Sequence, residues 1–183
     1  MIRVATYNLY LGADLALLFG ATDAADLDRK VGLLRGQLRS TAPAERAAAV
    51  ARLLARHRPD LVGVQELTRW TLAPYEGSAA VVSDFRAELA AALERAGCPY
   101  DVHAVAPSFG GGMPVPGVGL LSVEGVNAVL VRRGGPVTVE AAESGAFARR
   151  LCVPTAVPGV ESSRSSAAGA RCAAGTGIAR SAS

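Results

Sequence analysis

The spacing of apolar positions indicates one strong helix followed by a buried strand. The helix begins near Pro43, which suits a first turn, and Pro59 ends it. Four residues follow the i, i+3, i+4, i+7 spacing of a helix face: Val50, Leu53, Leu54 and His57. Three arginines lie off this stripe and are predicted to face solvent: Arg46, Arg52 and Arg56. The continuous apolar run Leu61–Val64 then predicts a buried strand.

Weaker patterns predict the remaining elements of the chain. Further helices are expected over Asp26–Leu38 and from about Asp84 to Ala96. Further strands are expected over four runs: Ile2–Tyr7, Tyr100–Ala106, Val126–Val131 and Pro136–Ala142. The glycine- and proline-rich run Pro107–Gly119 predicts a loop, and Arg132–Gly135 predicts the turn of a hairpin joining the last two strands. The alternation of helices and strands predicts an α/β fold.

The pattern stops at about Pro158. Residues 158–183 are rich in Ala, Arg, Gly and Ser and show no period of 2 or 3.6, which predicts disorder. Such a composition is also typical of a shifted reading frame in GC-rich DNA. We therefore divide the 183-residue chain into a folded part, 1–157, and a disordered tail, 158–183, which a frameshift could have produced.

Composition excludes several classes of protein. The net charge of +3 does not single out nucleic acid as a partner, and the three cysteines form neither a disulfide framework nor a zinc motif. No signal peptide is visible, and no apolar run approaches the roughly 20 residues that cross a bilayer. The sequence therefore predicts a cytoplasmic protein with no transmembrane segment and no obligate protein partner. A leader lost upstream remains an open alternative.

Polar side chains follow two of the predicted strands. Asn8 comes after the first strand, and Gln65 and Glu66 come after Leu61–Val64. Ligands gather beyond the carboxyl ends of strands in α/β proteins, and a carboxylate with neighbouring amides suits Mg²⁺. Each residue also has a simpler interpretation: Asn8 could bond a turn backbone, and Glu66 could be a solvated residue after a buried strand. Their occurrence together favours a site.

The run Ala5–Asp14 resembles the opening strand of the endonuclease/exonuclease/phosphatase family. The segment from Arg46 to Leu67, which ends in P-D-L-V-G-V-Q-E-L, is similar to that family's helix and Q-E strand. The resemblance covers roughly residues 1–150. It implies a four-layer α/β/β/α sandwich, of which this chain would hold the N-terminal half, incomplete at its C-terminus.

The resemblance also implies an activity, the hydrolysis of a phosphate ester with Mg²⁺ or Mn²⁺. Glu66 matches the family's metal-binding Glu, and Asn8 matches the Asn beside the metal and the scissile phosphate. Both are therefore candidate catalytic and metal-site residues. The substrates that the family includes are nucleic acids, inositol phosphates and phospholipid head groups.

The later motifs of the family are missing from this chain. The sequence lacks three of them: an N-x-H-L run, a G-D-x-N loop and an S-D-H terminus. The two histidines, His57 and His103, match no family motif. The general base is therefore absent, and we expect the truncated chain to be inactive. One alternative is a non-catalytic remnant or binding module that uses an open sheet edge. Another is the non-functional product of a damaged gene.

Overall fold

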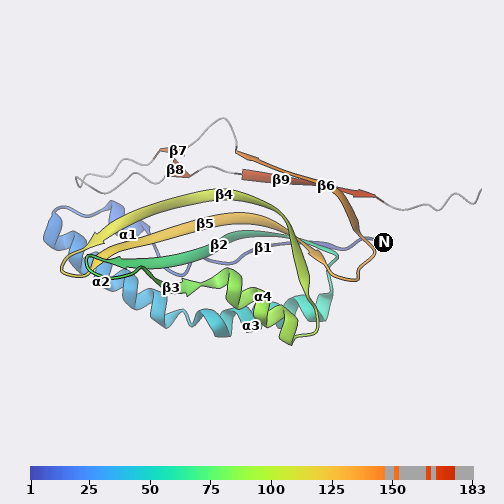
Figure 1. The fold of residues 1–183 in the computed structure, drawn as a ribbon, viewed down its shortest axis with the longest axis horizontal. Helices are drawn as coiled ribbons and strands as arrows, with labels where there is room; N and C mark the ends of the chain where they lie inside the picture. The colour runs from blue at the N-terminus through green and yellow to red at the C-terminus, as the bar shows by residue number, and fades with distance from the viewer. Residues whose placement is uncertain (147–150, 153–163, 166–167, 176–183) are drawn as a thin grey trace, which may run out of the picture.

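The computed structural model describes residues 1–146, 151–152, 164–165 and 168–175 and shows an α/β fold (Figure 1). Four helices are present in these residues: α1 (Ala16–Phe19), α2 (Ala24–Ser40), α3 (Pro43–His57) and α4 (Phe85–Arg95). The long strands are β2 (Leu61–Pro74), β4 (Tyr100–Val115) and β5 (Gly119–Arg132). The shorter strands are β1 (Val4–Asn8), β3 (Ala80–Asp84), β6 (Thr138–Ala146), β7 (Leu151–Cys152), β8 (Arg164–Ser165) and β9 (Ala168–Gly175).

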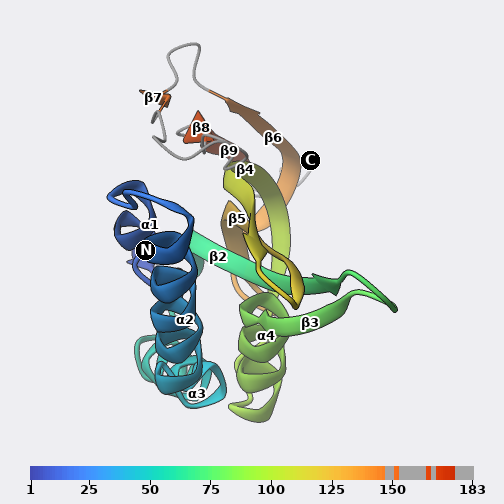
Figure 2. The ribbon, with the colours of Figure 1, turned by 90° about the vertical axis from the view of Figure 1, so that its left-hand side faces the viewer.

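The main sheet is mixed, with strand order β1-β2-β5-β4 and with β3 also paired to β2. Only the β1–β2 pair is parallel among these pairings, because β5 runs antiparallel to both β2 and β4. The helices α2, α3 and α4 lie on one side of this sheet, and the β6–β9 ribbon lies on the other (Figures 1 and 2). The four-layer sandwich that the resemblance implies stays a prediction.

The three long helices begin at residues where the sequence provides a signal. The Asp23 side chain caps α2 by accepting a hydrogen bond from Asp26 N, and the Asp84 side chain caps α4 by accepting one from Ala87 N. Helix α3 starts at Pro43 and ends at Arg58, which adopts a left-handed conformation with φ of 47°. The helices predicted from periodicity are therefore confirmed.

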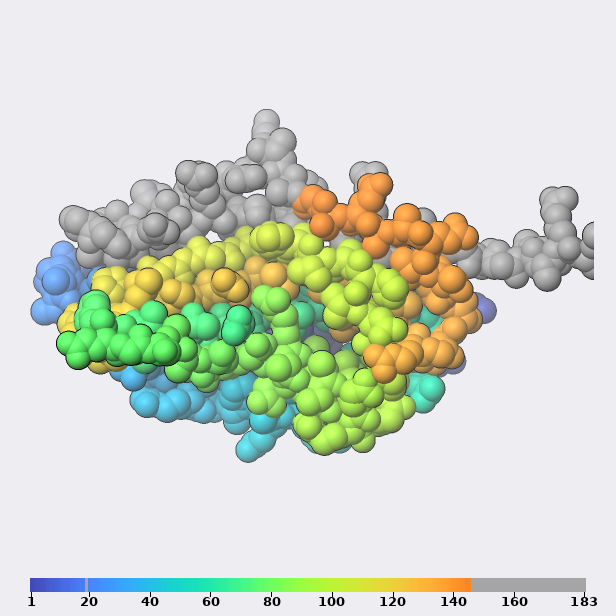
Figure 3. All heavy atoms as spheres, in the orientation of Figure 1, coloured from blue at the N-terminus to red at the C-terminus, as the bar shows by residue number. Residues whose placement is uncertain are grey.

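Two apolar clusters on the helix side hold the sheet to the helices. One lies between the sheet and the helices α3 and α4, and it includes Leu54, Val62 and Leu93. The other lies under α1 and α2 and is built around Trp70, which is 1% exposed and donates from Nε1 to the carbonyl of Leu11 at 2.9 Å. In the space-filling view, the residues of α3 and α4 cover the lower side of the sheet (Figure 3).

A buried carboxylate ties the start of β1 to the sheet. Asp60 is 4% exposed, and its Oδ2 accepts a hydrogen bond of 2.9 Å from the backbone N–H of Arg3. Its other oxygen forms an ion pair with Arg132 at the end of β5. A buried charge needs such partners, so Asp60 fixes the relative positions of β1, β2 and β5 at this end.

Two predictions for residues 100–146 are wrong. Residues 107–115, predicted as part of a loop, continue β4, because their backbone pairs with β5 as far as Val115–Gly119. The sheet satisfies the backbone of this Gly- and Pro-rich run, and a register shift at Pro107 accommodates the missing N–H. The hairpin is the second error: β5 pairs with β2 and β4, and β6 pairs with β9 instead.

The predicted tail, 158–183, contains two of the described strands. Residues 168–175 form β9, which pairs antiparallel with β6, and residues 164–165 form β8. The sequence gave no sign of this pairing, because small residues without periodicity carry no information on which edge they join. The rest of the predicted tail lies outside the described residues.

Candidate functional site

The parallel pairing of β1 with β2 brings the candidate residues together. Asn8 lies opposite Gln65 in the register of these strands, and Leu9 N donates to Gln65 O at 2.9 Å. β1 ends at this pair, whereas β2 continues to Pro74, so Gln65 and Glu66 lie within β2 and do not follow its end as the sequence predicted. The prediction that Asn8 and Glu66 lie side by side is confirmed, because the two side chains are in contact.

A β-bulge in β2 sets the position of Glu66. Val64 lies opposite Ala128 of β5, whereas Leu67 lies opposite Val126, so Gln65 and Glu66 together face one residue of β5. Glu66 has φ of 57°, a left-handed conformation that costs a non-glycine residue about 1 kcal/mol or more. Bulges and strained residues of this kind re-aim side chains and cluster at functional sites.

Three hydrogen bonds fix the two side chains relative to each other. Asn8 Nδ2 donates to Glu66 Oε1 at 2.8 Å, and Leu11 N donates to Glu66 Oε2 at 2.9 Å. Tyr10 N donates to Asn8 Oδ1 at 2.8 Å, which orients the amide with its NH₂ group towards the carboxylate. Asn8 therefore orients Glu66 in this structure, and each carboxylate oxygen keeps lone pairs for a further ligand.

Gln65 belongs to a neighbouring contact between the same strands. Its Nε2 donates to Thr6 Oγ1 at 3.0 Å, a diagonal contact because Thr6 itself lies opposite Gly63. Gln65 therefore links β1 to β2 beside the Asn8–Glu66 pair, consistent with a supporting role.

Arg46 supports the turn that follows β1. Its Nη2 donates to the carbonyl of Tyr10 at 3.3 Å, and its guanidinium lies 5.4 Å from the Tyr10 ring centroid and 4.6 Å from that of Phe85. Burial lowers the pKa of Arg46. The prediction that Arg46 lies on a solvated face is wrong: the side chain is half-buried, and its Nε and Nη1 atoms form no hydrogen bond with the residues that the structure describes.

The side chains around Glu66 offer few ligands for a divalent cation. Among the described residues, no group of three or more His, Cys, Asp or Glu side chains is close enough to enclose a metal ion. His57 ends α3 and His103 lies exposed on β4, so neither joins Glu66 in the hydrogen-bonded group above. A single carboxylate with water and substrate oxygens still fits Mg²⁺, which keeps several waters and is often held by one or two carboxylates.

Comparison with protein-family models, curated proteins and solved structures found no match to this chain. The case for a function therefore depends on the geometry above and on the motif resemblance. In the part of the chain that the structure describes, no helix is long and apolar enough to cross a membrane.

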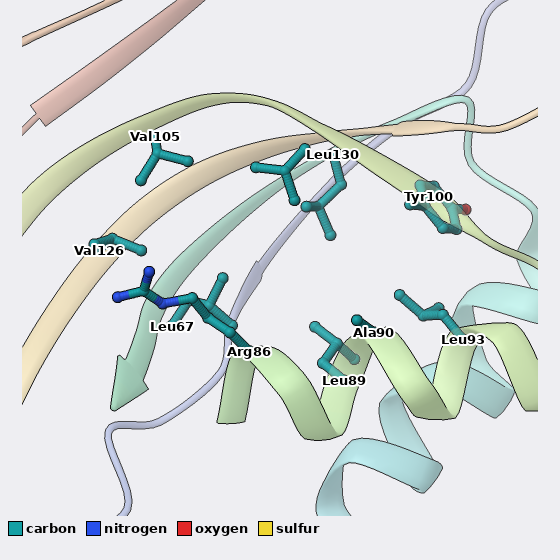
Figure 4. A pocket seen from close by; sticks show the side chains of 10 residues that line it. Leu67, Arg86, Leu89, Ala90, Leu93, Tyr100, Val105, Val126 and Leu130 are labelled. Atoms are coloured by element: carbon teal, nitrogen blue, oxygen red, sulfur yellow. The ribbon is translucent and has the colours of Figure 1, made fainter. Parts of the chain in front are cut away.

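A separate cavity of about 80 Å³ lies between α4 and the sheet (Figure 4). Its walls are almost entirely apolar, with Leu89 and Leu93 from α4 facing Val126 and Leu130 of β5. Arg86 is the one charged residue of its lining. The cavity contains neither Asn8 nor Glu66, and its lining offers no convergent polar groups, so it is a packing gap beside the core and not a candidate site.

Proposed function

We propose that this chain carries the cation-binding half of a divalent-metal-dependent phosphoesterase. Glu66 is the metal ligand, and Asn8 holds its carboxylate in place. The substrate class is a phosphate ester, and the cation is Mg²⁺ or Mn²⁺. The observation that carries the proposal is the 2.8 Å hydrogen bond between Asn8, at the end of β1, and Glu66, in the bulge of the parallel neighbour β2.

The environment of Glu66 supports this role more than a structural one. A carboxylate kept only for stability would not need a left-handed backbone within a bulge. Outer-sphere partners that fix a ligand's orientation are typical of metal sites, and Asn8 and Leu11 N supply two of them. The exposed position of Asn8 leaves space beside the pair for a substrate.

A bound cation would neutralise phosphate charge and stabilise the leaving oxygen. The residues of this chain would hold that cation: Glu66 supplies an anionic oxygen as ligand, and Asn8 donates one N–H to the Glu66 carboxylate. The second N–H of the same amide remains as a donor for a phosphate oxygen. Arg46 holds Tyr10, and thereby the turn that carries the two backbone donors.

Turnover requires a base, and the Asn8–Glu66 group contains no histidine. A positioned base normally contributes about 10²–10⁴-fold, so we expect metal binding by this chain with little hydrolysis. The test is Mn²⁺ binding, measured by electron paramagnetic resonance, together with Mg²⁺-dependent hydrolysis of bis(p-nitrophenyl) phosphate.

Glu66→Gln and Glu76→Gln form a matched pair of variants for this test. Glu76 is exposed in the turn between β2 and β3, so its loss removes the same charge elsewhere. The proposal predicts that Glu66→Gln abolishes saturable Mn²⁺ binding and that Glu76→Gln retains it. Equal Mn²⁺ binding by both variants would show that Glu66 is not the ligand, and rapid hydrolysis by the wild-type chain would show that a base is present.

A further inference from the structure

Strand β1 is an edge of the main sheet with hydrogen-bonding groups that point away from it. Leu61 N donates to Arg3 O, and Leu9 N donates to Gln65 O, so the odd-numbered residues of β1 face β2. In a parallel ladder the alternate residues, Val4 and Thr6, then direct their N–H and C=O groups outward. Within the described ranges, β1 pairs with β2 alone. Such an edge can accept another strand.

A groove of about 490 Å³ runs beside this edge, between β1 and α3. Leu53 and Leu54 of α3 form part of its wall, and Val4 and Tyr7 of β1 line it as well. Val4 is 71% exposed, Leu53 is 40% exposed and Tyr7 is 38% exposed, which leaves apolar surface beside the free backbone groups. An extended segment on β1 would therefore gain both backbone hydrogen bonds and apolar contacts.

The charge around the groove selects the occupant. Arg3 and His57 line it, and Arg56 and Arg58 are exposed at the same end of α3. The acidic residue of α3, Glu45, lies in its first turn, at the opposite end of the helix. Two occupants from this protein itself are possible. A second copy of β1 would bring its own basic residues next to those of the groove. The segment 162–183 carries three arginines and no acidic residue, so it would also be repelled. Both are poor matches for a basic groove.

We propose that this groove binds an extended, acidic segment of another protein, which adds to β1 as a further strand. The backbone groups of Val4 and Thr6 supply the main-chain hydrogen bonds, and Leu53 takes an apolar side chain. The basic end, with Arg3 and His57, takes the acidic side chains. This inference does not depend on the metal site: within the described residues, Asn8 and Glu66 form side-chain hydrogen bonds with each other, Tyr10 N and Leu11 N, and Tyr10 and Leu11 lie outside the groove lining.

The probe is a fluorescent peptide of about eight residues that alternates valine and glutamate, the length of an ordinary strand. A peptide that alternates valine and lysine tests the charge preference, and a version with N-methylated backbone amides tests strand addition. Fluorescence anisotropy with the full chain should show saturable binding of the acidic peptide alone. The affinity should weaken as NaCl rises from about 50 to about 300 mM, because exposed charges are screened.

Two variants test the contacts, and a third serves as the control. Val4→Pro removes one outward N–H at the first position of an edge strand, where proline is tolerated, and should weaken binding about 3- to 10-fold. Leu53→Glu places a negative charge beside the acidic peptide and should weaken peptide binding at least about 5-fold, because the two charges repel. Leu33→Glu changes a residue of α2 that is 52% exposed and outside the groove lining, and should leave the affinity unchanged.

Three results would overturn the inference. Equal binding of the acidic and basic peptides would remove the charge argument, and tight binding of the N-methylated peptide would remove strand addition. Sedimentation showing a dimer that Leu53→Glu dissociates and that the acidic peptide cannot displace would make a second copy the occupant. Urea unfolding of each variant distinguishes lost binding from lost folding, since all three changes lie at exposed side chains.

Discussion

Asn8 donates a hydrogen bond of 2.8 Å to Glu66 although the two residues lie 58 positions apart in the chain. The contact exists because β1 and β2 are parallel neighbours and the last residue of β1, Asn8, lies opposite Gln65 of β2. The bulge that follows Val64 then turns Glu66 towards Asn8 and the backbone N–H of Leu11. One pairing and one bulge therefore create the candidate site.

Replacing Asn8 by Ala should weaken Mn²⁺ binding about 10- to 100-fold, the range for loss of a partner that orients a metal ligand. Asn8 is exposed, so the free energy of unfolding should change little. Titration of Mn²⁺ by electron paramagnetic resonance measures the affinity. Thr6→Val is the control, because it removes only the neighbouring contact with Gln65. An unchanged affinity in Asn8→Ala would remove Asn8 from the site.

The strain at Glu66 can be measured separately from its carboxylate. Glu66→Gly and Glu66→Ala both lose the hydrogen bonds to Asn8 and Leu11, but only Ala keeps a Cβ at φ of 57°. We expect the Gly variant to be more stable than the Ala variant by about 1 kcal/mol in urea unfolding. A more stable Ala variant would show that the left-handed conformation is not maintained in solution.

Arg46 and Phe85 should show energetic coupling. The Arg46 guanidinium lies 4.6 Å from the ring centroid of Phe85, which is 1% exposed, so the contact is largely shielded from water. A double-mutant cycle with Arg46→Met and Phe85→Leu should give a coupling free energy of about 0.5–2 kcal/mol. Chemical unfolding of the four proteins provides it. Strictly additive effects would contradict the contact.

Acid should destabilise the protein through Asp60. The hydrogen bond from Arg3 N, followed by the bond from Arg132, holds the pKa of Asp60 below its ordinary value of 3.8. The unfolded state therefore takes up the proton at a higher pH than the folded state. The stabilisation by Asp60 is complete above the unfolded pKa and is lost as the pH falls through the lower folded pKa.

Asp60→Asn tests this dependence directly. The variant should be less stable than the wild type at neutral pH, because Arg132 loses its ionic partner. Its free energy of unfolding should also fall less steeply between about pH 5 and about pH 2. The remaining slope includes Asp101, whose pKa Arg133 also lowers. If the free energy of unfolding of Asp60→Asn fell with pH as steeply as that of the wild type, other carboxylates would be the cause of the acid sensitivity.

Local sequence signals were sufficient for α2, α3 and α4 and for the start of β2, but they gave no sign of α1. The proline boundaries of α3 and the apolar run before Gln65 are short-range features, and both appear in the structure. The sequence also predicted that Asn8 and Glu66 lie side by side, although it ended the second strand at Val64 and β2 continues to Pro74. Which catalytic role either residue has stays a prediction.

The features that the sequence missed depend on contacts between distant segments. The bulge at Glu66 is visible only once β2 is paired with β5, because it is a difference in register between the two strands. The helical periodicity predicts that Arg46 faces solvent. The side chain is half-buried because Phe85 and Tyr10, which are distant in the sequence, pack against its guanidinium group. The glycines and prolines after Pro107 favour a loop, but these residues extend β4 because their backbone pairs with β5 as far as Val115.

The most direct test of the proposed metal site is a crystal of this chain soaked in MnCl₂, with data collected at the manganese absorption edge. The account predicts an anomalous peak about 2.0–2.2 Å from a carboxylate oxygen of Glu66, the usual distance for a small divalent cation and oxygen. The same peak should be missing in Glu66→Gln. A wild-type crystal without a peak at Glu66, or a peak that survives the substitution, would contradict the assignment.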